Sequence, residues 1–227
     1  MTAPPYPPSP QRRERPRIPG TTFVLSAIMT TFLLQVFTGA WRDPLLLQQW
    51  SVSGYDVFVR GEYWRLLTAI FLHGNGTPGI TLVHLALNVL SLFQLGFLFE
   101  TRFGARRLLI VFFVTGLVAS LASAWANRGP SVGASGAVFG IVGAYMMAVV
   151  RSPRLRRERF ARSIVSQLVV LTIINIGVGS TIPMIDMSAH IGGLVAGMVI
   201  GAILPHQPPP PPPPAEVVID VTPYGAG

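Results

Sequence analysis

The sequence predicts an all-α membrane protein built as a bundle of six transmembrane helices. Half of the 227 residues are hydrophobic, only 11% are charged and the mean hydropathy is +0.53, which is too apolar for a water-soluble domain of this size. Six apolar segments of nearly membrane-spanning length follow one another along the chain. The arginines lie in short clusters between these segments, as expected for loops at a membrane surface.

The six expected helices form a membrane domain over residues 21–204. They are Thr21–Trp41, Ile80–Phe99, Leu108–Ala126, Ala134–Val150, Ser163–Gly177 and Ile182–Leu204. Each approaches the roughly 20 residues that cross a hydrocarbon core of about 30 Å. The fourth and fifth are short, so we expect neighbouring helices rather than lipid to cover them.

Two tails flank this domain, and both are predicted to be disordered. Residues 1–20 are rich in Pro and Arg and contain no apolar run. Residues 205–227 contain the run Pro208–Pro214, which cannot be helical and favours extended polyproline II.

The distribution of arginine predicts the orientation in the membrane. The chain has 17 arginines and no lysine. Thirteen arginines precede the first segment or lie in the loops after the second and fourth, whereas the opposite loops hold only four. Both termini are therefore expected in the cytoplasm. The bias toward Pro, Ala, Gly and Arg is compatible with a GC-rich bacterial genome, so we expect a multi-pass protein of a bacterial plasma membrane.

Composition also narrows the chemistry. With no cysteine, the chain cannot form disulfides, Cys-zinc sites or a thiol nucleophile. The arginine clusters do not make the domain-wide basic patch that nucleic-acid binding requires. The candidate histidines lack a nearby cluster of Asp or Glu, so we expect no metal and no cofactor. The expected partners are the lipid bilayer and proteins embedded in it.

Polar side chains within spanning helices are costly, so each is a functional candidate. His84 and Asn88 lie four residues apart on one face of the second helix, Ser135 opens the fourth helix, and His190 lies early in the sixth. These three helices run in the same direction. His84, Ser135 and His190 are therefore expected at similar depth, about 5 to 10 Å below the outer surface.

Glycines indicate how these groups can meet. Gly193 and Gly197 continue the face of His190, and Gly136 and Gly140 are spaced by four residues on the fourth helix. Small faces of this kind let two helix backbones approach closely in lipid, although such repeats are also common in general packing. Close approach is what a hydrogen bond between Ser135 and His190 requires.

The turn that begins at Gly133 gives Ser135 a second chemical advantage. Backbone N–H groups at a helix start lack partners within the helix and lie at the positive end of the helix dipole. An oxyanion forming beside Ser135 would be stabilised there, and His84 and Asn88 can add side-chain donors.

These residues resemble those of the rhomboid family of intramembrane serine proteases. The resemblance rests on Trp64-Arg65, His84-x-x-x-Asn88 with Gly96 and Glu100, Gly133-Ala134-Ser135-Gly136, and Ala189-His190-x-Gly192-Gly193, in family order. It covers nearly all of the membrane region. Phe139 stands where the family often has a tyrosine packed on the histidine, and the stretch between His73 and His84 is longer than usual.

The resemblance implies a rhomboid-like bundle that cleaves single-span membrane proteins near the outer face of the bilayer. It implies Ser135 and His190 as the catalytic dyad, with His84, Asn88 and the Ser135 backbone amide as the oxyanion site. In this mechanism His190 takes the Ser135 proton, an acyl-enzyme forms, and water from the external side hydrolyses it. His190 must be neutral to act as a base, so activity should fall on acidification.

Three alternatives remain beside this interpretation. Asp186 lies four residues before His190 and would be the carboxylate of a triad, although the resemblance implies a dyad. A non-catalytic rhomboid-like binder would be expected to lack the serine or the histidine. A transporter would need polar groups through the whole depth of the membrane, whereas here they gather in the outer third. Substrate entry is expected to be lateral, through the short fifth helix and the loop after it.

Overall fold

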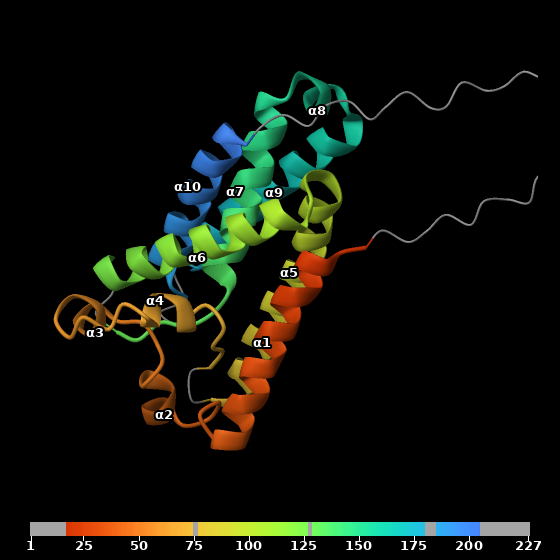
Figure 1. The fold of residues 1–227 in the computed structure, drawn as a ribbon. Helices are drawn as coiled ribbons and strands as arrows, with labels where there is room; N and C mark the ends of the chain where they lie inside the picture. Colours follow the sequence, from red (N-terminus) through yellow and green to blue (C-terminus); the bar gives the residue numbers. More distant parts are fainter. Residues whose placement is uncertain (1–16, 75–76, 127–128, 180–184, 205–227) are drawn as a thin grey trace, which may run out of the picture.

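The computed structural model describes residues 17–74, 77–126, 129–179 and 185–204, and the part of the chain that it describes is all-α. Six long helices are α1 (Pro19–Thr38), α5 (Pro78–Phe103), α6 (Ala105–Ala126), α7 (Ser135–Arg151), α9 (Arg159–Gly179) and α10 (Met187–Ile203). Four short ones are α2 (Pro44–Gln48), α3 (Gly54–Phe58), α4 (Arg65–Thr68) and α8 (Pro153–Arg157). Figure 1 shows α8 at the opposite end of the bundle from α2. Both predicted tails, apart from residues 17–20, lie outside the described residues.

The six long helices confirm the predicted all-α membrane bundle. Helices α1, α5, α6 and α9 are long and apolar enough to cross a membrane, whereas α7 and α10 are apolar but have 17 residues each. A helix of 17 residues is about 26 Å long, close to the thickness of a hydrocarbon core. The chain is therefore an integral membrane protein.

The prediction for the fifth helix was wrong in two respects: its length, and the expectation that neighbouring helices bury it. Helix α9 has 21 residues rather than the 15 of Ser163–Gly177, because it starts at Arg159, where the polar first turn hid it in the hydropathy pattern. Of the four helices that are long and apolar enough to cross a membrane, it is the least buried: 11% of its most apolar 18 residues are covered, against 28% to 50% in the others. The short fourth helix is buried as expected: more than half of the α7 residues are inaccessible.

The sixth helix also starts later than predicted. Asp186 ends the preceding loop and caps α10, so the helix begins at Met187 rather than at Ile182, which lies outside the described residues. The first helix ends at Thr38 instead of Trp41. Gly39 adopts a left-handed conformation there (φ 80°), a common way to end a helix.

A buried carboxylate joins α1 to α5. Glu100 accepts hydrogen bonds from the backbone N–H groups of Gly20 (2.9 Å) and Thr21 (2.7 Å) and from the Thr21 hydroxyl (2.6 Å). The first N–H groups of a helix have no partner of their own, and they favour negative charge. Glu100 therefore caps α1 and fixes it beside α5.

Glycines let α7 and α10 pack with their backbones in contact, and these two helices lie side by side in Figure 1. A Cβ atom at Gly193 would overlap the carbonyl oxygen of Gly136, and one at Gly197 would overlap that of Gly140. All four glycines are buried. The predicted packing faces therefore meet each other, and this contact determines how closely Ser135 and His190 approach.

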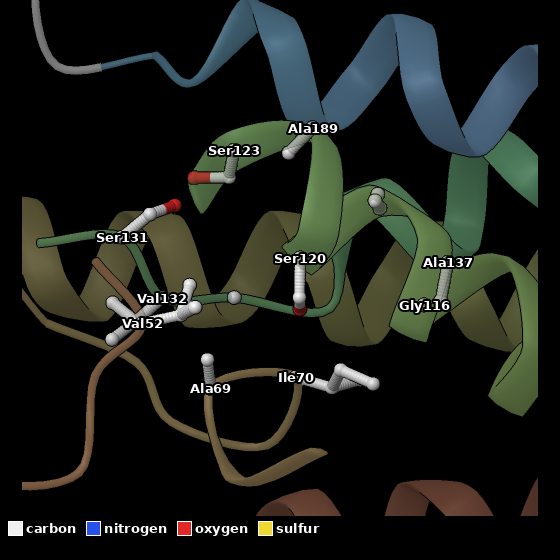
Figure 2. Close-up of a pocket in the computed structure, with 13 residues that line it drawn as sticks. Val52, Ala69, Ile70, Gly116, Ser120, Ser123, Ser131, Val132, Ala137 and Ala189 are labelled. Carbon is white, nitrogen blue, oxygen red and sulfur yellow. The ribbon is translucent and has the colours of Figure 1, made fainter. Parts of the chain in front are cut away.

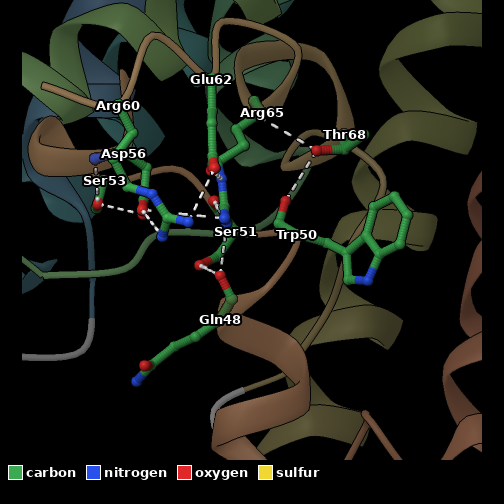
Figure 3. A network of polar contacts seen from close by, with 9 residues as sticks. All are labelled: Gln48, Trp50, Ser51, Ser53, Asp56, Arg60, Glu62, Arg65 and Thr68. Atoms are coloured by element: carbon green, nitrogen blue, oxygen red, sulfur yellow. Dashed lines mark hydrogen bonds and ion pairs between the residues drawn. The ribbon is translucent and has the colours of Figure 1, made fainter. Parts of the chain in front are cut away.

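The long segment before α5 is compact, because a buried arginine holds it together. The Arg65 guanidinium donates to the carbonyl oxygens of Gln48 (2.6 Å) and Ser51 (3.1 Å) and pairs with Glu62, as Figure 3 shows. Arg65 is buried, so its planar fork replaces the water that these carbonyl groups would otherwise bind. Val52 of the same segment pairs with Ser131, just before α7.

Candidate active site

The start of α7 and the first turn of α10 bring the predicted nucleophile and base together. The Ser135 Oγ atom and the His190 Nε2 atom lie 2.8 Å apart, a hydrogen-bond distance. Ser135 is the first residue of α7, and His190 is the fourth of α10. Because the glycine contact between these helices begins one residue after Ser135, the close approach of the backbones produces this distance directly.

The His190 ring is held by stacking rather than by a second hydrogen bond. It stacks on Phe139 of α7 with ring centroids 4.4 Å apart and planes 19° apart. Its Nδ1 atom is buried and has no hydrogen-bond partner. Asp186 therefore does not accept a hydrogen bond from this ring, which argues against the triad arrangement.

Gly133 lies between the predicted oxyanion donor His84 and Ser135. A Cβ atom at Gly133 would lie 2.9 Å from the His84 Nε2 atom and 4.0 Å from the Ser135 Oγ atom. Gly133 also has a φ of 125°, which side chains of L residues rarely adopt. Two separate reasons therefore require glycine at position 133: the backbone conformation and the lack of space for a side chain. The absence of a side chain lets the His84 ring reach the site from α5.

Asn88, the other predicted side-chain donor, is engaged within its own helix. Its Nδ2 atom donates to the His84 carbonyl oxygen one turn earlier (2.9 Å). Asn88 is buried on the same face of α5 as Leu85 and Leu92. One hydrogen of the Asn88 amide therefore bonds within α5, and the second hydrogen is the one that an oxyanion would accept.

The start of α7 leaves its backbone donors open. No side chain caps this helix among the described residues, and its N-cap residue is Ala134. The preceding residue, Gly133, donates its N–H to the Ala69 carbonyl oxygen (2.9 Å), which fixes the turn against the end of α4. The N–H groups of the first turn, which starts at Ser135, therefore lie without a side-chain cap at the positive end of the helix dipole.

A small cavity lies beside this helix start, and Figure 2 shows its lining. Its walls come from α6, from the end of α4 and from the segment before α7, and Gly136 and Ala189 also line it. Three serines, Ser120, Ser123 and Ser131, contribute hydroxyl groups. Apolar walls with a few hydroxyl groups can hold water beside Gly133 and Gly136, which flank Ser135 in the sequence.

This cavity and its serines were not predicted from the sequence. Ser120 and Ser123 lie three residues apart within an apolar helix, a pattern that marks one polar face and could have singled them out. Ser131 carried no such signal, because it lies in a loop. His73 was also missed: its ring lies 5.2 Å from the His84 ring, although the two residues are separated by eleven positions.

The fold and this site define a class: a polytopic α-helical membrane protein with a serine and a histidine in contact near one end of the bundle. Residues 60–207 match the model of the Rhomboid domain. The chain belongs to the rhomboid family.

Similar proteins come from bacteria and plants. The chain is 36% identical to the Rhomboid protease GluP of Bacillus subtilis (strain 168) over 182 residues, which are 80% of this chain and 34% of that protein. It is 34% identical to RHOMBOID-like protein 5 of Arabidopsis thaliana over 65% of this chain and 46% of that protein. It is 31% identical to the Rhomboid protease AarA of Providencia stuartii over 67% of this chain and 61% of that protein. The chain thus spans between a third and a half of the length of the first two relatives.

Proposed function

We propose that this protein is an intramembrane serine endopeptidase, with Ser135 as nucleophile and His190 as general base. The 2.8 Å distance between the Ser135 Oγ atom and the His190 Nε2 atom carries this proposal. A histidine in that position takes the serine proton as the hydroxyl attacks a carbonyl, and returns it to the leaving amine. Two bacterial relatives are named as rhomboid proteases, which supports the same chemistry.

The tetrahedral intermediate would place its oxyanion among the open donors at the start of α7. The Ser135 backbone N–H, the His84 ring and the Asn88 amide are the proposed donors. Preorganised donors of this kind typically contribute about 10²- to 10³-fold each to the rate. Water held in the serine-lined cavity would then hydrolyse the acyl-enzyme. Acidification that protonates His190 removes the base and should abolish the reaction.

The charges at the two ends of the bundle support an orientation. Nine arginines lie in the last turn of α5, in the first turn of α6, or between the last residue of α7 and the first turn of α9, whereas the segment with α2 to α4 has three. We place the α8 end in the cytoplasm, and with it both termini, by the positive-inside rule. The site then lies near the outer face of a membrane, which the composition and the bacterial relatives suggest is a bacterial plasma membrane. The proposed substrates are single-span membrane proteins cut near that face.

Lateral entry of a substrate helix is the access route that this fold supports. Helix α9 is the least buried of the long helices and packs chiefly on α7 and α8. It can therefore shift with little loss of buried surface. Because the chain has no cysteine, an engineered disulfide between α5 and α9 would be the sole crosslink, and it should abolish cleavage of a membrane substrate. Full activity of the crosslinked protein would reject this gate.

The deciding experiment is cleavage of a fluorogenic transmembrane-segment substrate by the purified protein, together with labelling by a fluorophosphonate probe. We expect cleavage by the wild type and a covalent adduct on Ser135. Ser135→Ala and His190→Ala should each lose at least about 10³-fold in rate. Ser166→Ala, which changes an exposed serine on α9, is the matched control and should cleave normally. A wild type that binds the substrate without cleaving it would favour the non-catalytic binder, and cleavage by Ser135→Ala would reject the mechanism.

A further inference from the structure

Asp186 ties the start of α10 to α6 through both of its carboxylate oxygens. One oxygen, Oδ1, accepts a hydrogen bond from the backbone N–H of Ala189 (3.0 Å) and so caps α10. The other, Oδ2, accepts the hydroxyl hydrogen of Ser123 on α6. The Asp186 carbonyl oxygen also accepts the N–H of His190 (3.2 Å), the first hydrogen bond of the helix ladder. A single residue therefore determines where α10 begins and where its first turn lies against α6.

This placement matters because the His190 ring has few contacts that orient it. The ring makes one hydrogen bond, to Ser135, and its Nδ1 atom has none. Its stacking on Phe139 fixes the plane of the ring. A further restraint is the position of the α10 backbone, which the Asp186 carboxylate secures one turn before the ring.

The Ser123 contact is specific rather than incidental to a polar surface. Ser123 is buried, with 1% of its surface exposed, in a part of α6 that is apolar apart from Ser120. A hydroxyl group in such surroundings requires a partner, and a carboxylate that accepts from it forms a strong, charge-assisted hydrogen bond. Helix α6 packs on both α7 and α10, so the pair connects α10 to the element on which α7 also rests.

We propose that Asp186 is a positioning residue: together with Ser123, it sets the distance between His190 and Ser135 by fixing the first turn of α10. This proposal rests on the proposed protease activity. It differs from a triad role because the carboxylate acts on the helix backbone and on α6, not on the imidazole. Asn keeps a cap oxygen and can donate its amide to the Ser123 oxygen, whereas Ala keeps neither contact.

The test compares Asp186→Ala, Asp186→Asn, Ser123→Ala and the Asp186→Ala/Ser123→Ala double variant. A displacement of reacting groups by a fraction of an ångström to one ångström costs about 10- to 100-fold in rate, so we expect Asp186→Ala to lose that much in kcat, with KM within about twofold. Asp186→Asn should stay within about threefold of the wild type. Ser123→Ala should lose about threefold to tenfold, and the double variant should be no slower than Asp186→Ala. Fluorophosphonate labelling of Ser135 should slow in the same order.

Asp43→Ala is the matched control, because Asp43 caps α2 with the same carboxylate chemistry and lies outside the site. It should leave kcat unchanged. Equal kcat in Asp186→Ala and the wild type would overturn the positioning role, and so would a loss of 10³-fold or more in Asp186→Asn, which would restore a triad. If Asp186→Ala does not fold, a normal kcat for Ser123→Ala overturns the proposal. Absence of wild-type cleavage and labelling would instead refute the protease function.

Discussion

The rings of Phe139 and His190 stack face to face. Phe139 lies on α7, four residues after the proposed nucleophile Ser135, and His190 lies on α10 within hydrogen-bond distance of Ser135. We expect Phe139→Ala to lower kcat by about 10- to 100-fold, because the imidazole loses the surface that fixes its plane. Phe139→Tyr should keep most of the activity, since the ring is what stacks. Cleavage of the fluorogenic substrate measures both variants. A variant Phe139→Ala with normal kcat would show that the ring is held by other contacts.

The glycine contact between α7 and α10 predicts a loss of stability from one methyl group. In Gly197→Ala the new Cβ atom would overlap the Gly140 carbonyl oxygen, which is backbone and cannot swing aside. The helices must separate, at a cost of about 2 to 4 kcal/mol in the free energy of unfolding. Gly79→Ala is the matched control, because nothing lies within 4 Å of its added Cβ atom. Thermal unfolding in detergent should show a clear fall in Tm for Gly197→Ala and a change within error for Gly79→Ala.

The sequence predicted the helices and singled out Ser135 and His190, because both predictions rest on local, periodic signals. Apolar length marks spanning helices, and a polar group in such a helix is conspicuous, so Ser135 and His190 stood out. Because Asp186 caps the last helix, that helix starts five residues later than the hydropathy pattern predicted, and a cap of this kind does not change the hydropathy. The polar first turn of α9 hid its true length for the same reason.

Contacts between distant segments could not be predicted. The cap on α1 joins Glu100 to Gly20 and Thr21, which lie 80 and 79 positions earlier in the chain. The ring contact between His73 and His84 depends on the path of the chain between them. The fold of the segment before α5 depends on which carbonyl groups face Arg65, and no periodic pattern in the sequence predicts which groups these are. The Trp64-Arg65 motif indicated the family, but only the folded structure shows what the guanidinium binds.

Arg65 provides the next prediction. Its fork serves two carbonyl groups and Glu62 at once, and a lysine ammonium cannot span all three. Arg65→Lys should therefore lower the free energy of unfolding by about 2 to 3 kcal/mol through buried acceptors left unpaired. Arg60→Lys is the matched control: Arg60 also pairs with Glu62, but its side chain is 52% exposed, so its ion pairs are screened. Equal Tm values for the two variants would contradict the role assigned to the Arg65 network.

His73 predicts how stability depends on acid. It lies between α4 and α5, fully buried, and burial, reinforced by the neighbouring His84, lowers its pKa from 6.5 to about 3. The Nδ1 atom contacts the Phe71 carbonyl oxygen (3.2 Å) and so carries the proton of the neutral ring. The Nε2 atom is buried without a partner, and a second proton there would find no acceptor.

The sign of the effect follows from the two pKa values. Between pH 6.5 and about 3 the unfolded chain binds a proton that the folded chain excludes, so the stability present above pH 6.5 is lost as the pH falls. At pH 5 the loss from this residue is about 2 kcal/mol. Thermal unfolding at pH 7 and pH 5 should show this as a drop in Tm for the wild type. His73→Gln removes the titrating group but leaves His84 and His190 in place, so its Tm should fall less between the same two pH values, even though the variant starts from a lower Tm. An equal drop in both proteins would mean that His73 takes up its proton while folded.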